Sequence, residues 1–344
     1  MAPPLSLSVL DLAPVPSGSS SGDALRNSID LARHADRLGF TRYWMAEHHN
    51  MASVVSSAPE ILLGVIARQT TRIRVGSGGI MLPNHAPLKV AENFRTLEAL
   101  APGRIDLGIG RAPGSDPMTA LALRRSPEAM RAAEDLPLLL AELEAFGGGG
   151  FPAGHPFAAV QAAPMDVPLP PVWLLGSSTY SARLAARQGR GFAFAYHFSA
   201  EQAGPALRLY REEFTPSAQL AEPQAILAVS VVCAPSEAEA DYLATTLDLS
   251  FLNIRRGLRG PLPSPQEALA YPYSEAERAF VQGYRASQVI GSPAQVRARL
   301  AWLAAELGAQ EVMLTSNIHD HAARLRSYAL AAEVFDLATA VAAG

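Results

Sequence analysis

The sequence predicts an α/β fold, a (β/α)₈ TIM barrel with insertion loops, and three observations support this prediction. Short runs of β-branched and other apolar residues alternate with longer segments in which apolar residues recur at helical spacing. Eight such short runs occur, and each reads as buried on both faces, which is typical of a parallel sheet. The chain has 344 residues, of which 49% are hydrophobic, so we expect a single domain over residues 1–344.

The predicted strands and helices follow one another in regular order. The first strand is expected at Leu5–Asp11, and the helix after it begins at an N-cap in Ser21-Gly22-Asp23 and ends at Gly39. The other strands are expected at residues 42–48, 72–79, 104–110, 172–177, 192–197, 225–234 and 311–316. The other helices are expected at residues 58–68, 87–100, 180–188, 201–214, 237–247, 293–307 and 321–337.

An open, doubly wound sheet would give a similar alternation of strands and helices. Such a sheet binds dinucleotides at a glycine-rich turn after its first strand. Asp11-Leu12-Ala13-Pro14 stands at that point here, so the barrel is preferred.

Two segments interrupt the repeat. Residues 146–171 contain four consecutive glycines and many prolines, and we expect a loop there. Residues 250–292 hold Arg255-Arg256-Gly257 and a Pro/Gly-rich stretch, and are also expected to form a long loop. Loops of this length inside a barrel are often lids or binding loops, and a tolerated surface insertion is the alternative.

Composition excludes several classes of function. The net charge of −4 and a pI near 6.1 argue against a nucleic-acid partner. Lys89 is the only lysine and lies in a predicted helix, which argues against Schiff-base and pyridoxal phosphate chemistry. Cys233, the single cysteine, lies in an apolar run and is expected to be a buried strand residue. No signal peptide or membrane-spanning run is evident, so we expect a cytoplasmic protein.

Polar residues stand where the predicted strands end. In a TIM barrel the carboxyl ends of the strands carry the reactive groups, and such polarity is hard to explain as core packing. The residues at these ends are Asp11, Glu47-His48-His49-Asn50, Ser77-Gly78-Gly79, Gly110-Arg111, Gly176-Ser177-Ser178, His197, Ser316-Asn317 and His319.

Ser177-Ser178-Thr179 lies between a strand and a helix and has the features of an anion site. Helix N-termini present free backbone N–H groups, and hydroxyls add further donors. An ordinary serine N-cap would look the same. Arg111, which follows the neighbouring strand, favours the anion site, and this combination suits the 5′-phosphate of flavin mononucleotide (FMN).

Adjacent histidines at positions 48 and 49 raise the question of a metal site. Successive residues of a strand point to opposite faces, so these two histidines cannot easily share one metal ion, and no metal is expected. We expect one histidine to point into the pocket and the other to pack outward or cap a helix. The run Gly76-Ser77-Gly78-Gly79 permits close approach of a flat ligand, although a simple bulge would have the same sequence.

In this order, these residues resemble the bacterial luciferase-like flavin-dependent monooxygenases. The resemblance is closest to a non-luminescent subgroup that opens with the Leu-Asp-Leu-Ala-Pro-x-Pro run found here at Leu10–Pro16. It covers nearly the whole chain and is weakest across the two insertions. The other supporting stretches are residues 43–50, 75–83, 103–111 and 172–178.

The resemblance implies a barrel that binds reduced FMN. Reaction of that flavin with O₂ gives a flavin C4a-peroxide, which oxidises a small organic substrate. It also implies a homodimer and, because no flavin-reducing domain is evident, a separate flavin reductase as the source of reduced FMN. His48 matches the family's catalytic histidine, and Gly78-Gly79 match a non-prolyl cis peptide under the flavin ring. Arg111, Ser177 and Tyr180 match the residues that hold the flavin phosphate, beside Ser178.

We assign His48 as a proton donor or acceptor or a hydrogen-bond partner, because imidazole titrates near neutral pH; a structural role is the alternative. His197 and Asn317 are expected to line the substrate pocket, with Asp11 on its floor or wall, unless they cap neighbouring helices. Luciferase carries a reactive cysteine where this chain has Gly110, so light emission is not expected, and extra room is expected there.

Three other functions remain open at this point. The first is a deazaflavin F420-dependent oxidoreductase of the same fold, and the second is a flavin-binding protein without catalysis. The third is an aldolase or metal-dependent hydrolase, which the single lysine and the histidine spacing disfavour.

Overall fold

The computed structural model describes residues 5–112, 114–132 and 135–337 and has the predicted barrel. In this part of the chain, eight parallel strands pair in sequence order, and the last of them pairs with both its predecessor and the first, which closes the sheet. The barrel strands are β1 (Ser6–Asp11), β2 (Arg42–Met45), β3 (Arg74–Ser77), β5 (Ile105–Gly110), β6 (Val172–Gly176), β7 (Gly191–Ala195), β8 (Ala225–Cys233) and β10 (Glu311–Thr315).

Two predicted strands are shorter than expected. β2 ends at Met45, so His48 lies in the loop after the strand rather than at its last position. The third predicted strand is divided into β3 and a short strand, β4 (Ile80–Met81), which pairs with β5. Between the two lies a cis peptide bond that joins Gly78 to Gly79.

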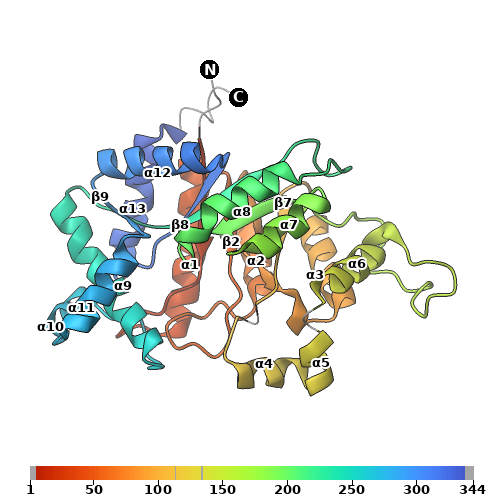
Figure 1. Cartoon of the computed structure of the whole chain (residues 1–344), viewed down its shortest axis with the longest axis horizontal. Helices are drawn as coiled ribbons and strands as arrows, with labels where there is room; N and C mark the ends of the chain where they lie inside the picture. The colour runs from red at the N-terminus through yellow and green to blue at the C-terminus, as the bar shows by residue number, and fades with distance from the viewer. Residues whose placement is uncertain (1–4, 113, 133–134, 338–344) are drawn as a thin grey trace.

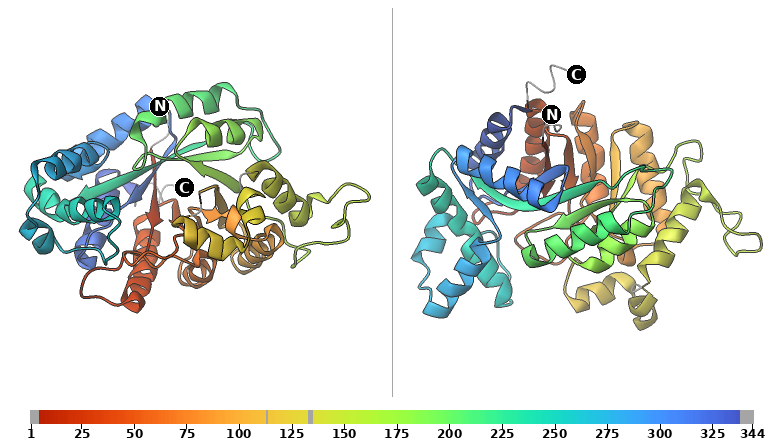
Figure 2. Two further views of the ribbon diagram at one scale, coloured as in Figure 1. Left: turned by 60° about the horizontal axis from the view of Figure 1, so that its bottom comes forward. Right: turned by 45° about the horizontal axis from the view of Figure 1, so that its top comes forward.

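Helices surround the barrel on the outside and contact their neighbours in order (Figures 1 and 2). The N-cap of the first helix is Ser20, one residue before the expected N-cap region, and its side chain accepts the Asp23 amide in a capping box. The helix ends at Gly39, whose φ of 88° is the left-handed conformation that glycine adopts readily. The surrounding helices are α1 (Ser21–Leu38), α2 (Pro59–Gln69), α3 (Pro87–Leu100), α7 (Thr179–Arg187), α8 (Ala200–Glu212), α12 (Pro293–Leu307) and α13 (His321–Val334).

The barrel interior is filled by apolar side chains from alternate strand positions. Leu10, Trp44, Trp173 and Met313 belong to this inner cluster, and the two tryptophan rings meet edge to face at 5.8 Å. The neighbouring strand positions, such as Val9, belong to the larger cluster between the strands and the surrounding helices. The closed interior leaves the carboxyl ends of the strands as the place for a binding site.

The two insertions differ in structure. Residues 146–171 lack regular structure after a short π-helical turn, η2 (Ala145–Gly149), as expected of a loop. The stretch before them forms α4 (Pro117–Arg124), α5 (Pro127–Ala132) and α6 (Leu136–Glu144), for which no element had been expected.

The prediction of a long loop over residues 250–292 is wrong, because most of that segment is regular. It holds the end of α9 (Glu237–Arg255), α10 (Pro265–Ala270), α11 (Glu275–Arg285) and a short strand β9 (Val289–Gly291) beside β8. The helices α10 and α11 begin at Ser264 and Ser274, each in a capping box with a glutamate three residues later. A serine followed by a glutamate three residues later signals the start of a helix. The sequence prediction gave more weight to the prolines and glycines of the segment, which indicate a loop.

Among the described residues, none of the helices combines the length and the apolar character that crossing a bilayer requires.

Candidate flavin and substrate site

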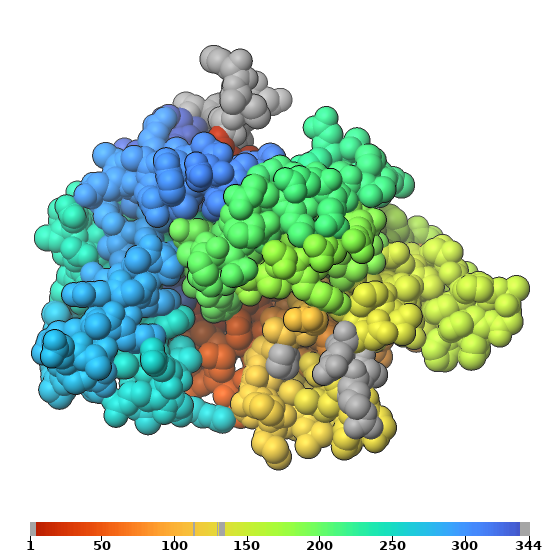
Figure 3. Space-filling model, viewed as in Figure 1, coloured from red at the N-terminus to blue at the C-terminus, as the bar shows by residue number. Residues whose placement is uncertain are grey.

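Three adjoining cavities lie at the carboxyl ends of the strands. An inner cavity of about 200 Å³ lies over the barrel interior, an outer cavity of about 530 Å³ lies above it, and a side cavity of about 190 Å³ lies beneath α9 and α11. His48 and Phe198 line all three. Figure 3 shows a hollow on this face between α4 and the segment that follows α9.

His48 is the polar one of the two residues that line all three cavities. Its Nδ1 atom is buried and has no hydrogen-bond partner among the described residues. Burial lowers the pKa of His48 to about 4, although the nearby Glu47 carboxylate acts to raise it. The imidazole is therefore neutral at neutral pH, which corrects the expectation that it titrates there.

Glu47 anchors the loop that carries His48. Its Oε1 lies 2.7 Å from Nε2 of His49 and 2.8 Å from Nε2 of His85, and its Oε2 accepts the Met81 amide at 2.8 Å. Burial acts to raise the pKa of Glu47, but these hydrogen bonds outweigh it and hold the pKa at about 2. His49 is thus engaged by Glu47 and reaches only the outer cavity, while His48 faces all three.

A metal site is not formed by these residues. Among the residues that the structure describes, no group of three or more His, Cys, Asp or Glu side chains is arranged to hold a metal ion.

Gly78 and Gly79 form part of the wall of the inner cavity. The cis peptide bond between them confirms the feature that the resemblance implied. A Cβ atom at Gly78 would lie 2.6 Å from the Leu10 side chain, and one at Gly79 would lie 2.7 Å from the Gly108 carbonyl oxygen. The backbone contact leaves room only for glycine at position 79, while a side chain at position 78 would require Leu10 to move.

Hydroxyl and guanidinium groups gather at another part of the inner cavity. Arg111, Ser177 and Ser178 all line it, as expected, and Ser181 joins them from the first turn of α7. Ser178 is the N-cap of α7, and its side chain makes no capping hydrogen bond. The backbone amides at the helix start remain available to a ligand.

Tyr180 contributes to this region in a different way. It does not line the inner cavity, and the Arg111 guanidinium lies over its ring at 4.4 Å from the ring centre. The ring therefore supports Arg111 through a cation–π contact. Sequence reasoning missed Ser181, although its place three residues after Ser178 puts both on the same side of the helix start.

His197 and Asn317 line the cavities as expected. His197 lines the inner and side cavities, and its Nδ1 lies 3.0 Å from the Ala228 carbonyl oxygen. Burial lowers the pKa of His197. Asn317 lines the side cavity, and its Oδ1 is buried without a hydrogen-bond partner among the described residues.

Asp11 does not lie on the floor or wall of these cavities, so that expectation is wrong. Its side chain points away from the barrel interior, where Arg324 of α13 donates to it at 2.6 Å and Tyr43 donates a further hydrogen bond. Burial acts to raise the pKa of Asp11, but the Arg324 charge and the hydrogen bonds outweigh it and keep the pKa low. The pleat explains the difference, because Leu10 and Leu12 take the cavity-facing positions on either side.

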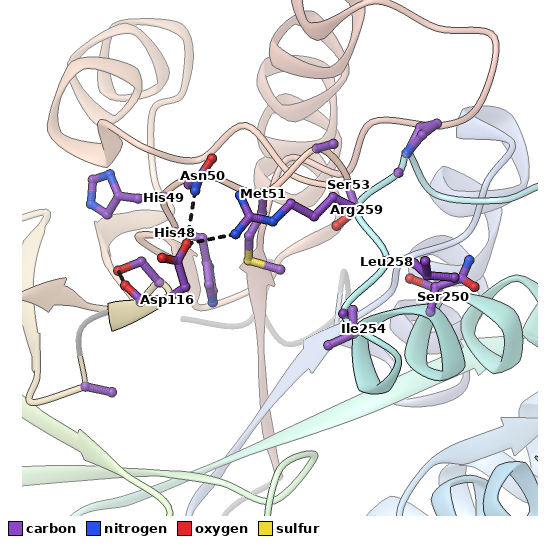
Figure 4. Close-up of a pocket in the computed structure, with 18 of the residues that line it drawn as sticks. His48, His49, Asn50, Met51, Ser53, Asp116, Ser250, Ile254, Leu258 and Arg259 are labelled. Carbon is purple, nitrogen blue, oxygen red and sulfur yellow. Dashed lines mark hydrogen bonds and ion pairs between the residues drawn. The ribbon is translucent and has the colours of Figure 1, made fainter. Parts of the chain in front are cut away.

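A polar contact bridges three loops above the outer cavity (Figure 4). Arg259, from the segment after α9, donates to Asp116 at 3.1 Å, and Asn50 donates to the same carboxylate oxygen at 3.0 Å. Asp116 also caps α4 by accepting the amides of Met118 and Thr119. None of this was predicted, because the three loops are far apart in the sequence.

Comparison with known proteins agrees with the fold. The model of the family described as luciferase-like monooxygenase matches residues 5–311. This chain belongs to that family. A luciferase-like monooxygenase of Escherichia coli K12 is 45% identical over 330 residues, which are 96% of this chain and 97% of the relative. The N-acetyl-S-alkylcysteine monooxygenase of Bacillus subtilis is 33% identical, covering 94% of this chain and 96% of the relative.

Solved structures of luciferase-like proteins share the architecture. The crystal structure of apo-MsnO8 is 40% identical, has a TM-score of 0.87 and covers 97% of this chain and 98% of that one. More distant likenesses show the fold alone. One is an FMN complex of the oxygenating constituent of 3,6-diketocamphane monooxygenase from Pseudomonas putida. It is 17% identical, has a TM-score of 0.69 and covers 96% of this chain and 97% of that one. Another is an F420-dependent secondary alcohol dehydrogenase, which is 12% identical, has a TM-score of 0.66 and covers 97% of this chain and 99% of that one. Membership of this family supports an oxidoreductase.

Gly110, the departure from the luciferase pattern, does not leave extra room. A Cβ atom there would lie 2.9 Å from the sulfur of Met81, whose side chain fills the space and lines the inner and outer cavities. The expectation of a larger cavity at this point is therefore wrong, since a residue from β4 takes the place of the missing side chain.

Proposed function

We propose that this luciferase-like protein is a monooxygenase that uses reduced FMN and O₂ to oxidise a small organic molecule. One observation carries the proposal. A single cavity is lined at once by Arg111 with the serines at the start of α7, by Gly78 and Gly79, and by His48.

The residues present fit FMN. Arg111 and the uncapped start of α7 offer a charge and several hydrogen-bond donors to a phosphate group. Leu10, Trp44 and Leu175 give the cavity apolar walls suited to an aromatic ring system. His48 Nδ1 adds a buried polar atom that has no hydrogen-bond partner in the described part of the chain and that a ligand would satisfy.

FMN, when bound, supplies the redox chemistry, and the chain supplies binding, orientation and protection from water. In this proposal Arg111, Ser177, Ser178 and Ser181 hold the phosphate. The absence of Cβ atoms at Gly78 and Gly79 allows a flat ligand to approach the backbone. His48, neutral at working pH, exchanges one hydrogen bond or proton at a ring nitrogen. We expect reduced FMN to come from a separate flavin reductase.

The test is an anaerobic titration of the purified chain with reduced FMN, with F420 as the competing cofactor. Saturable binding of reduced FMN, and oxygen consumption that depends on an added organic substrate when a reductase is present, support the proposal. N-acetyl-S-alkylcysteines are the first substrates to examine, because the 33% identical relative is named for them. Binding of F420 without binding of FMN would overturn it.

A further inference from the structure

The side cavity presents buried polar groups that no protein atom satisfies. The Thr315 side chain, at the end of β10, is 4% exposed, and its Oγ1 has no hydrogen-bond partner among the described residues. Asn317 and His48 line the same cavity, and their Oδ1 and Nδ1 atoms are also buried without a hydrogen-bond partner among the described residues. Buried polar atoms are nearly always hydrogen-bonded, so three such atoms around one cavity indicate a missing partner.

Strand geometry explains why these groups face the cavity. Met313 points into the barrel interior, so Thr315 and Asn317, two and four residues later, continue on the same side of the chain. Thr315 is the register partner of Ser230 on β8, directly above the pair Met313 and Ala228. The side chains of Thr315 and Ser230 therefore stand side by side above the apolar interior, where packing alone would favour valine or alanine.

The rest of the lining restricts the charge of an occupant. Among the described residues, the side cavity is lined by no Asp, Glu, Lys or Arg. Burial lowers the pKa of both histidines that line it, so they are neutral at neutral pH. Leu247, Phe251 and Leu262 cover much of the remaining wall. An ion would lose its hydration here without gaining an opposite charge, so an uncharged, partly apolar group fits best.

We propose that the side cavity is the substrate subsite and that it binds an uncharged organic group with an apolar body and one amide. The Thr315 hydroxyl can donate to a carbonyl oxygen, and the Asn317 carboxamide oxygen can accept from an N–H group. An amide offers both partners together, whereas an ester or ketone offers only the acceptor. The proposal deepens the proposed function, because it concerns the molecule oxidised beside His48.

The experiment measures binding of two matched probes to the full-length chain by ligand-observed NMR. The probes are N-butylacetamide and butyl acetate, which differ by one N–H group. We expect the wild type to bind the amide about three- to tenfold more tightly than the ester, the effect of one net hydrogen bond. In the double variant Thr315→Val/Asn317→Leu, which keeps the side-chain sizes, we expect this preference to disappear.

Control variants keep the test decisive. Thr315→Ser retains the hydroxyl and should retain the preference, and Thr215→Val makes the same type of change at an exposed residue before β8 and should leave it unchanged. Circular dichroism and thermal melting establish that each variant is folded. If the double variant does not fold, Asn317→Leu alone should abolish the preference, because Asn317 supplies the acceptor for the N–H group, while Thr315→Val alone should weaken binding of both probes.

Equal affinity of the two probes for the wild type, or an unchanged preference in the folded double variant, would overturn the proposal. The measurement is made with and without FMN. Failure of FMN to bind would remove the proposed cofactor, while a preference for the amide that depends on Asn317 would still identify the subsite.

Discussion

The Glu47 carboxylate accepts the backbone amide of Met81 at 2.8 Å, which ties the loop after β2 to the strand that follows Gly78-Gly79. The two residues are 34 positions apart in the sequence, and Met81 lines the inner cavity. His48, which directly follows Glu47, and Gly79, which closely precedes Met81, also line that cavity. Glu47 thus positions the cavity wall without lining it.

Replacing Glu47 by Gln should lower the free energy of unfolding at neutral pH by about 3 kcal/mol. This is the free energy that corresponds to the lowering of the Glu47 pKa from 4.5 to about 2. Because the folded-state pKa is lowered, this stabilisation is complete above about pH 4.5 and is lost as the pH falls toward about 2. Urea unfolding of both proteins across this range measures it. A difference in stability that stays constant with pH would contradict the role assigned to the ionised carboxylate.

Arg111→Ala should weaken binding of reduced FMN at least tenfold, because a charged hydrogen bond to phosphate contributes about 1.5–3 kcal/mol. The matched control is Arg183→Ala, which removes a half-exposed arginine from the outer face of α7 and should not change the affinity. Fluorescence titration under anaerobic conditions measures both. Equal affinities of the wild type and Arg111→Ala would exclude Arg111 from the phosphate site.

His48→Ala should lower turnover by about 10²–10⁴-fold while FMN affinity is largely retained, because positioned proton transfer typically contributes that much. Since burial holds the pKa of His48 at about 4, the wild-type rate should show no step from this residue near pH 6.5. Imidazole NMR signals assigned through the His48→Gln variant test the ionisation directly. A His48 signal that titrates near pH 6.5 would contradict the neutral state.

Arg324→Met should destabilise the protein by about 3–5 kcal/mol, because it leaves the fully buried Asp11 carboxylate without its charged partner. The double variant Asp11→Leu/Arg324→Met should recover most of this loss, since it removes both charges. Urea unfolding measures the three free energies. The same substitution at the exposed Arg26 serves as the control and should have no measurable effect.

Gly79→Ala should destabilise the protein by about 1–3 kcal/mol, because the new methyl group would meet the rigid Gly108 carbonyl at 2.7 Å. Gly110→Ala meets only the flexible Met81 side chain and should cost less than about 1 kcal/mol. Thermal unfolding compares the two variants. Losses of equal size would show that the backbone around Gly79 adapts as readily as Met81 does.

Local patterns predicted most of the fold and many of the candidate site residues. The alternation of apolar runs predicted the eight barrel strands, because the residues that bury a strand follow one another in the sequence and form a recognisable apolar run. His48, Arg111 and Ser177 were found because polar residues at the carboxyl end of a barrel strand have no place in the core. The helices α10 and α11 were missed because the prolines and glycines of this segment masked two capping boxes.

The sequence by itself determined the order of strands and helices, the family, and the residue types that stand at the strand ends. Only the tertiary structure decided what those residues face. It turned Asp11 toward Arg324, filled the space at Gly110 with Met81, and left Thr315 Oγ1 and Asn317 Oδ1 without hydrogen-bond partners among the described residues. The physical reason is that a strand side chain changes face with every residue, and its partner comes from a segment whose distance along the chain no local pattern records.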